Sequence, residues 1–176
     1  MSKFIKILFG IGGLVMAIFN FQANAAELKV GDSAPLFSTQ THEGKSFELA
    51  SRRGKWTVLY FYPKAQTPGC TKQACAFRDS IDVIRKLDAE VYGVSSDTVQ
   101  DQAKFHKHEH LNFPLLADAD LKIISAYGTK LPGLNFSRRW TFIIDPELKV
   151  RSIDHDVDPV LDAKKTADQI SAFKKN

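Results

Sequence analysis

The segment from Trp56 to Cys70 constrains the fold of this 176-residue chain more than any other. Residues 56–62 (WTVLYFY) form a continuous β-branched and aromatic run, which predicts a central strand covered on both faces. After PKAQTPGC the apolar residues recur at spacings of three and four, at Ala74, Phe77, Ile81 and Ile84. The sequence therefore predicts that a helix over 71–87 follows the strand directly, as in an α/β fold.

The remaining patterns extend this α/β order to the end of the chain. Further strands are predicted at 90–95, 113–116, 139–144 and 150–153. Further helices are predicted at 98–110, 121–127 and 160–173. The last two strands are joined by a turn that contains Pro146, so they form a hairpin. This order predicts a thioredoxin-like fold, in which a mixed central sheet carries helices on both faces.

The first 25 residues differ in composition from the rest of the chain. Lys3 and Lys6 are their only charges, and an apolar run of 13 residues follows at 7–19. That run is shorter than the roughly 20 residues needed to cross a bilayer as a helix. Ala23 and Ala25 supply small residues at the two positions that a signal peptidase reads. These features predict a secretory signal peptide at 1–25.

Removal of this leader has consequences for charge and location. Cleavage before Ala26 leaves 26–176 as one domain, which we expect in the periplasm or outside the cell, without stable membrane association. The formal net charge of the chain is +4, and without the two leader lysines it is +2. Acidic and basic residues alternate along the domain, as on a solvated surface, so nucleic acid is not an expected partner. We expect a monomer or a weak dimer.

Cys70 and Cys75 are the two cysteines of the chain and stand five residues apart. A disulfide that closes so short a loop would constrain little of the unfolded chain, so redox chemistry or metal binding is favoured. Cys70 would lie in the first turn of the helix, where unpaired N–H groups and the helix dipole favour a thiolate over a thiol. This position, close to prolines and a hydroxyl, is typical of a nucleophile.

Pro63, Thr67 and Cys70 stand in the pattern Pro-x-x-x-Thr-x-x-Cys, within the stretch YFYPKAQTPGCTKQACAFRD. In this pattern the chain resembles the peroxiredoxins, and the stretch is similar to the bacterioferritin-comigratory, or Q-type, subfamily. The resemblance extends over 27–153 and fades in the last helix. It implies a thiol peroxidase that reduces hydrogen peroxide and organic hydroperoxides without a cofactor or a metal. It also implies a thioredoxin-like or other dithiol reductant as partner.

The resemblance assigns a role to each of five residues. Cys70 matches the peroxidatic cysteine, and Cys75 matches the resolving cysteine that forms an intramolecular disulfide with the resulting sulfenic acid. Thr67 matches the hydroxyl that hydrogen-bonds the thiolate and the peroxide, and Pro63 matches the proline that shields the sulfur from water. Arg139 matches the arginine that stabilises the thiolate and the transition state.

Helix geometry limits how the two cysteines can react. Five residues of α-helix separate two Cα atoms by roughly 8.6 Å, whereas a disulfide tolerates at most about 6.8 Å. The first helical turn must therefore unwind in each cycle, and a helix terminus opens at low cost.

The sequence departs from the common family pattern at Leu148, in the segment 130–137 and in its secretory leader; many relatives are cytoplasmic, so the leader leaves the identity of the reductant open. Leu148 stands where a glycine often follows the Asp-Pro-Glu turn, which could alter the turn type of the hairpin. The segment 130–137 is shorter than in some relatives, so the resemblance leaves the peroxide entrance open. Arg138 and Arg139 point to opposite faces of one strand, and therefore only one of them can reach the site.

Two other functions remain compatible with the sequence. A Sco-type copper-binding protein uses the same fold with two cysteines and a histidine. His106, His108 and His110 lie on one predicted helix, but they favour a solvated face, and four residues separate the cysteines here instead of three. A periplasmic thiol-disulfide oxidoreductase would separate its cysteines by two residues.

Overall fold

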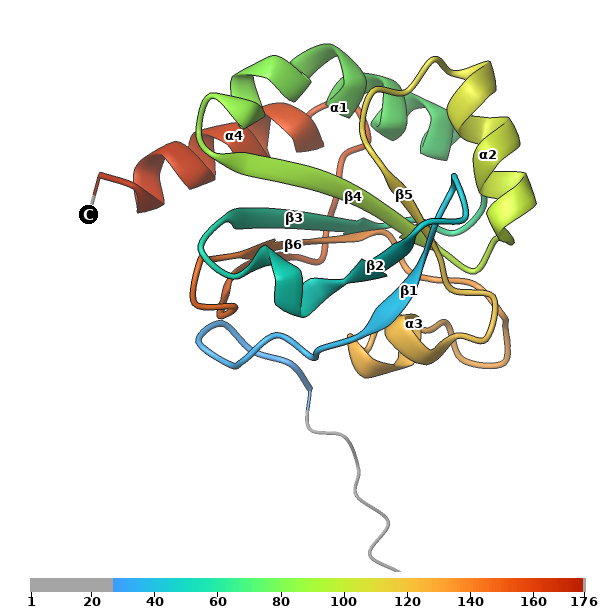
Figure 1. Cartoon of the computed structure of the whole chain (residues 1–176), viewed down its shortest axis with the longest axis horizontal. Helices are drawn as coiled ribbons and strands as arrows, with labels where there is room; N and C mark the ends of the chain where they lie inside the picture. The colour runs from blue at the N-terminus through green and yellow to red at the C-terminus, as the bar shows by residue number, and fades with distance from the viewer. Residues whose placement is uncertain (1–26, 176) are drawn as a thin grey trace, which may run out of the picture.

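A seven-stranded mixed sheet runs through the middle of the protein, seen in a computed structural model that describes residues 27–175 (Figure 1). The predicted signal peptide lies outside the described residues. The strands are β1 (Ser38–Thr41), β2 (Ser46–Glu48), β3 (Trp56–Phe61), β4 (Ala89–Ser95), β5 (Leu115–Ala117), β6 (Trp140–Ile144) and β7 (Val150–Asp154). Their order across the sheet is β2-β1-β5-β4-β3-β6-β7. The β3–β4 and β4–β5 pairs are parallel and the other pairs are antiparallel.

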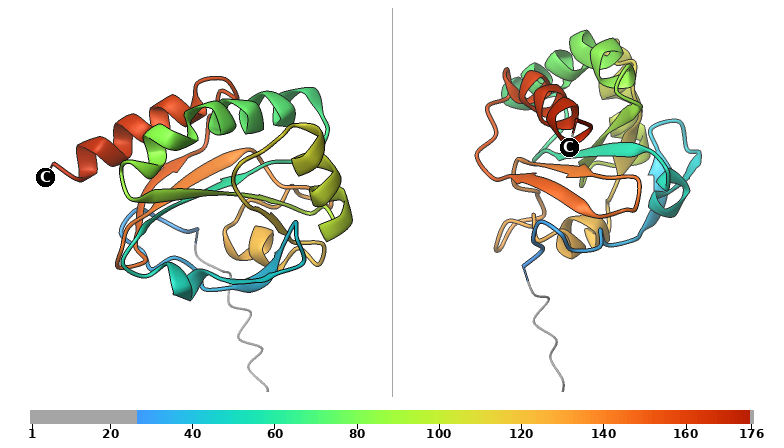
Figure 2. Two further views of the ribbon diagram at one scale, coloured as in Figure 1. Left: turned by 45° about the horizontal axis from the view of Figure 1, so that its top comes forward. Right: turned by 90° about the vertical axis from the view of Figure 1, so that its left-hand side faces the viewer.

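Helices cover both faces of this sheet. They are α1 (Pro68–Arg85), α2 (Val99–His108), α3 (Lys122–Ala126) and α4 (Asp162–Phe173), with a 3-10 helix at Leu49–Arg52. Helices α1 and α4 lie side by side on one face, and α3 lies on the other (Figures 1 and 2). The predicted mixed sheet with helices on both faces is therefore confirmed. No helix within residues 27–175 has the length and apolar character that a bilayer span needs.

Strand β3 is buried along its whole length, as its continuous apolar run predicts. Val58 and Tyr60 pack into the cluster beneath α1 and α4, and Leu59 and Phe61 pack into the cluster on the α3 side. Both faces of the strand are thus inside the protein, as expected when helices cover both sides of a sheet. The helix that follows begins at Pro68, three residues before the predicted start, and it includes Cys70 in its first turn.

Residues 38–48 form a hairpin, β1–β2, that the sequence analysis did not predict. Strand β1 reads Ser-Thr-Gln-Thr and buries only its last residue, so it carries no apolar alternation. Its order comes from pairing with β5, which lies far along the chain, and from the Thr39 hydroxyl, which donates to the carbonyl of Ala117. Such partners leave no local pattern in the sequence.

Leu148 adopts the left-handed backbone conformation, with φ of 62°, in the β6–β7 turn. This conformation costs a non-glycine residue roughly 1–2 kcal/mol. The Leu148 side chain is buried in the α3-side cluster, and its N–H donates to the carbonyl of Asp145 at 2.9 Å. The turn therefore keeps the backbone that a glycine would favour, and burial of the leucine offsets the strain.

Candidate active site

Cys70 lies at the point where β3 delivers the chain into α1. Thr67 is the N-cap residue of this helix, Pro68 follows it, and the first turn contains no acidic residue. The Cys70 side chain is 1% exposed and belongs to the core cluster beneath α1. Its sulfur is thus held at a helix N-terminus, where the unpaired N–H groups and the dipole favour negative charge.

Arg139, the residue just before β6, contacts the sulfur. Strand β6 pairs with β3 so that Trp140 lies opposite Phe61, and this register places Arg139 beside the start of α1. Arg139 Nη2 donates to Cys70 Sγ at 3.4 Å. A Cβ atom at Gly69 would lie 3.2 Å from Nη2, so the glycine leaves room for this approach.

Arg138, two residues before β6, has no hydrogen bond to Cys70 within residues 27–175. Its guanidinium stands 5.7 Å from the ring centroid of Trp140, and Trp140 packs against the α3-side cluster. Of the two neighbouring arginines, only Arg139 hydrogen-bonds to Cys70 within residues 27–175.

Gln73 holds the other side of the Arg139 guanidinium. Arg139 Nη1 donates to Gln73 Oε1 at 2.6 Å, and Gln73 Nε2 donates to Asp162 Oδ2 at 2.7 Å. Burial raises the pKa of Asp162 to about 6, although hydrogen bonds from Gln73 and Thr141 act in the opposite direction. Neither Gln73 nor Asp162 is among the site residues predicted from the sequence. Gln73 stands three residues after Cys70 and so shares its helix face, a spacing that could have revealed it.

Thr67 and Pro63 lie near the cysteine without contacting its sulfur through a hydrogen bond. The Thr67 hydroxyl donates to the carbonyl of Lys64 at 2.9 Å, and within residues 27–175 it has no hydrogen bond to Cys70. Pro63 lines a pocket of about 430 Å³ together with Arg139 and Trp140. Leu131 from the short 130–137 segment also borders this pocket, whereas Cys70 does not.

Asp97, which is not among the site residues predicted from the sequence, fixes the loop that leads to Cys70. Its buried carboxylate accepts from the Ala65 N–H at 2.8 Å and from the Ser95 hydroxyl at 2.7 Å. It also pairs with Lys64 Nζ at 2.5 Å. These contacts connect residues 64–65 to the end of β4, so the loop enters α1 along one path.

Cys75 has different surroundings, although it shares α1 with Cys70. Its thiol donates to Glu109 Oε2 at 3.7 Å, just beyond the end of α2. Burial raises the pKa of the Cys75 thiol; Arg78 lowers it, and the Glu109 carboxylate raises it. Both cysteines are free thiols in this structure. A disulfide between them thus requires a change in α1.

The histidines of α2 and its C-terminal end form no metal site with the cysteines. Within residues 27–175 no group of three or more His, Cys, Asp or Glu side chains is placed to hold a metal ion. His108 and His110 are exposed, as a solvated face predicts. His106 is half-buried and stacks on His42 with 3.7 Å between ring centroids, so the solvated-face prediction is wrong for this residue.

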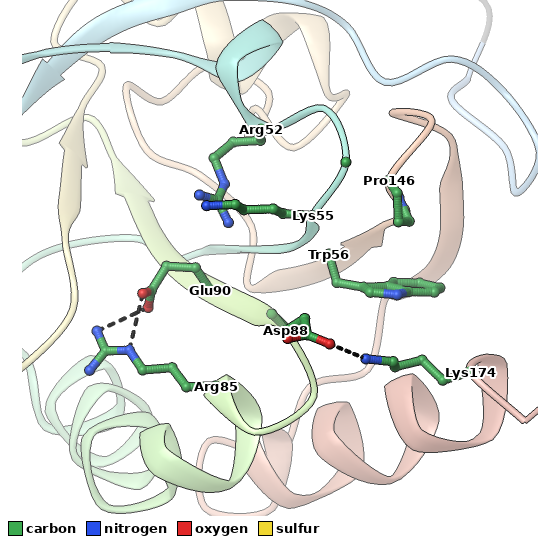
Figure 3. A pocket seen from close by; sticks show the side chains of 10 residues that line it. Arg52, Lys55, Trp56, Arg85, Asp88, Glu90, Pro146 and Lys174 are labelled. Carbon is green, nitrogen blue, oxygen red and sulfur yellow. Dashed lines mark hydrogen bonds and ion pairs between the residues drawn. The ribbon is translucent and has the colours of Figure 1, made fainter.

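Figure 3 shows a second pocket, which lies at the start of β3. It encloses about 550 Å³ and is bordered by Trp56, the first residue of the strand. Its two carboxylates are paired: Glu90 with Arg85 at 3.0 Å and Asp88 with Lys174 at 2.6 Å. This pocket is separate from Cys70, which follows the other end of the strand.

In this mixed α/β sheet, a cysteine at a helix N-terminus accepts a hydrogen bond from an arginine that directly precedes the adjacent strand. This arrangement is typical of a thiol-based redox protein with a thioredoxin-like fold. Residues 30–153 match the model of the AhpC/TSA family, and the chain belongs to that family. It is 37% identical over 135 residues to peroxiredoxin Bcp of Escherichia coli, covering 73% of this chain and 86% of the relative. The family and the predicted Q-type resemblance are thus confirmed.

Solved structures give the same result. The peroxidoxin BcpB of Mycobacterium tuberculosis superposes with a TM-score of 0.78 at 33% identity, over 83% of this chain and 98% of that one. The bacterioferritin comigratory protein of Xanthomonas campestris, studied for alkyl peroxide reduction, superposes with a TM-score of 0.75 at 26% identity. That match covers 81% of this chain and 99% of the other. The predicted thioredoxin-like fold is confirmed, and the comparisons favour a peroxiredoxin over both alternative functions.

Proposed function

We propose that this protein is a thiol peroxidase in which Cys70 reduces hydrogen peroxide and organic hydroperoxides. One observation carries the assignment: a buried sulfur at the α1 N-terminus lies 3.4 Å from a guanidinium donor. A thiolate with such a neighbour can attack an O–O bond while the developing negative charge on oxygen meets a hydrogen-bond donor.

The first step converts the Cys70 thiolate into a sulfenic acid. The sulfur attacks one peroxide oxygen, the O–O bond breaks, and the second oxygen leaves as water or an alcohol after taking a proton. Arg139 donates to the reacting atoms. The Thr67 hydroxyl, three residues before Cys70, is bonded to the Lys64 carbonyl in this structure, and it would exchange that acceptor for the peroxide in the reaction. Pro63, on the wall of the adjoining pocket, limits water around the sulfur.

The second step forms an intramolecular disulfide. The Cys75 sulfur attacks the sulfenic sulfur, the S–S bond forms, and water leaves. Because the two Cα atoms stand roughly 8.6 Å apart in a continuous helix, the first turn of α1 unwinds for this step. A thioredoxin-type dithiol protein then reduces the disulfide and returns both thiols.

One equivalent of hydrogen peroxide is therefore expected to oxidise the protein within one chain. Intact mass spectrometry should show the loss of two hydrogens, and peptide mapping should place the bond between Cys70 and Cys75. The Cys70→Ser variant serves as the control and should keep its mass. A covalent dimer on a non-reducing gel would contradict the resolving role of Cys75.

We also propose that the chain is exported and loses residues 1–25. The support is in the sequence: two lysines, a short apolar run, and alanines at the positions that a signal peptidase reads. Protein recovered from a periplasmic fraction or culture medium should begin at Ala26. Recovery of chains that begin at Met1 would sink this proposal, and it would leave the peroxidase assignment untouched.

A further inference from the structure

Asp162 is a buried carboxylate that hydrogen-bonds to the active-site network from the far end of the chain. It is the first residue of α4, its side chain is 2% exposed, and it follows the segment 30–153 that matches the family model. Its Oδ2 atom accepts from Gln73 Nε2 at 2.7 Å and from the Thr141 hydroxyl at 2.8 Å. A buried carboxylate with two such partners is held in one orientation.

The carboxylate fixes which end of the Gln73 amide faces Arg139. An ionised carboxylate can only accept hydrogen bonds, so Gln73 must present its NH₂ group to Asp162. The amide oxygen is then left to accept from Arg139 Nη1 at 2.6 Å. If the amide were turned over, its NH₂ group would face the guanidinium, and two donors would meet. The orientation of the arginine therefore depends on the acceptor at Asp162.

We propose that Asp162 is a positioning residue of the peroxidase site, acting through Gln73 to hold the Arg139 guanidinium against Cys70. The inference rests on the proposed function, since it specifies what keeps the arginine in its reactive place. It involves no direct contact of Asp162 with Arg139 or with the sulfur. Thr141 is the second residue of β6 and stands two residues after Arg139, so its bond to Asp162 holds the strand segment that directly follows the arginine.

A purely structural role for Asp162 is the alternative that experiments must distinguish from the positioning role. The Asp162 carboxylate also accepts a hydrogen bond from the Thr166 hydroxyl of its own helix, at 3.5 Å, and α4 packs on α1. In a purely structural role, removal of the carboxylate would loosen the packing of α4 on α1 and would have no other effect. A packing defect lowers stability but does not depend on which group of Gln73 donates. The two roles therefore differ in how they respond to an exchange of donor and acceptor.

Single variants at Asp162 test the role of its acceptor oxygen. Asp162→Leu removes the acceptor and should lower the second-order rate constant for hydrogen peroxide about tenfold, because Arg139 is no longer held in place. Asp162→Asn keeps an acceptor oxygen toward Gln73 and should stay within about threefold of wild type, since one hydrogen bond is retained. Asp168→Leu, at an exposed position of the same helix, is the matched control and should not change the rate.

An exchange of donor and acceptor tests the coupling directly. Gln73→Glu alone places two carboxylates in contact and should reduce the rate at least about tenfold. In the double variant Gln73→Glu/Asp162→Asn the new amide can donate to the new carboxylate, which still accepts from Arg139. The double variant should recover most of the wild-type rate. A packing role predicts no such recovery, and this test remains valid if Asp162→Leu fails to fold.

Alkylation of Cys70 tests the positioning role of Asp162 independently of the proposed peroxidase activity. In a Cys75→Ser background, the rate of Cys70 alkylation by iodoacetamide reports the thiolate without any peroxide chemistry. It should fall in Asp162→Leu and in Gln73→Glu, and it should recover in the double variant. If wild type fails to consume peroxide but the alkylation series behaves in this way, only the peroxidase assignment fails. Equal alkylation and peroxide rates in all variants would overturn the positioning role.

Discussion

Replacing Arg139 with alanine is expected to lower the second-order rate constant for hydrogen peroxide by about 10²-fold to 10³-fold, as for the loss of one well-placed donor to a developing oxyanion. Arg139 Nη2 is the donor placed on Cys70 Sγ, at 3.4 Å. Its removal withdraws positive charge from the thiolate and a hydrogen bond from the transition state. Stopped-flow measurements of peroxide consumption over a range of pH would quantify both effects.

Arg138→Ala is the matched control for this prediction. Arg138 is exposed, lies 5.7 Å from the Trp140 ring and has no contact with the sulfur, so its loss should leave the rate close to that of wild type. Raising the pH ionises thiols and would compensate for lost thiolate only. A rate for Arg139→Ala that high pH restored in full would therefore contradict a transition-state role, as would a crippled Arg138→Ala.

The elements that the sequence predicts well are those whose signal is local. Strand β3 is a continuous apolar run, which predicts burial of both its faces. Helix α1 has apolar residues at helical spacing, which predicts one buried face. The hairpin β1–β2 cannot be predicted from a local pattern, because its strands are short and β1 is ordered by pairing with the distant strand β5. Leu148 likewise keeps a glycine-like backbone because burial of its side chain offsets the strain.

The same distinction applies to the candidate site. Cys70, Thr67 and Pro63 are close in sequence and form a motif, and Arg139 is found by resemblance. Gln73 carries a weak signal, its spacing of three residues from Cys70, whereas Asp162 contacts Gln73 across 89 positions of sequence. No local pattern marks a carboxylate that becomes part of a site only when α4 packs on α1. Long-range hydrogen bonds of this kind need the folded structure.

Replacing Cys75 with serine is expected to abolish turnover with a thioredoxin-type reductant while leaving the first reaction with peroxide close to the wild-type rate. Cys75 donates to Glu109, and neither its thiol nor its carboxylate partner contacts Cys70. The raised pKa of the Cys75 thiol also keeps it protonated near neutral pH, so it does not compete for peroxide. A serine hydroxyl cannot attack a sulfenic sulfur to form a disulfide, and the cycle should stop there.

Mass spectrometry distinguishes this arrested state from a complete cycle. After one equivalent of peroxide, Cys75→Ser should gain one oxygen at Cys70, and excess peroxide should add a second oxygen to give the sulfinic acid. Wild type should resist that second addition, because the unwound first turn of α1 lets the disulfide form first. Cys70→Ser is the opposite control and should gain nothing. Sustained turnover by Cys75→Ser with the protein reductant would show that the reductant attacks the sulfenic acid directly and that α1 need not unwind.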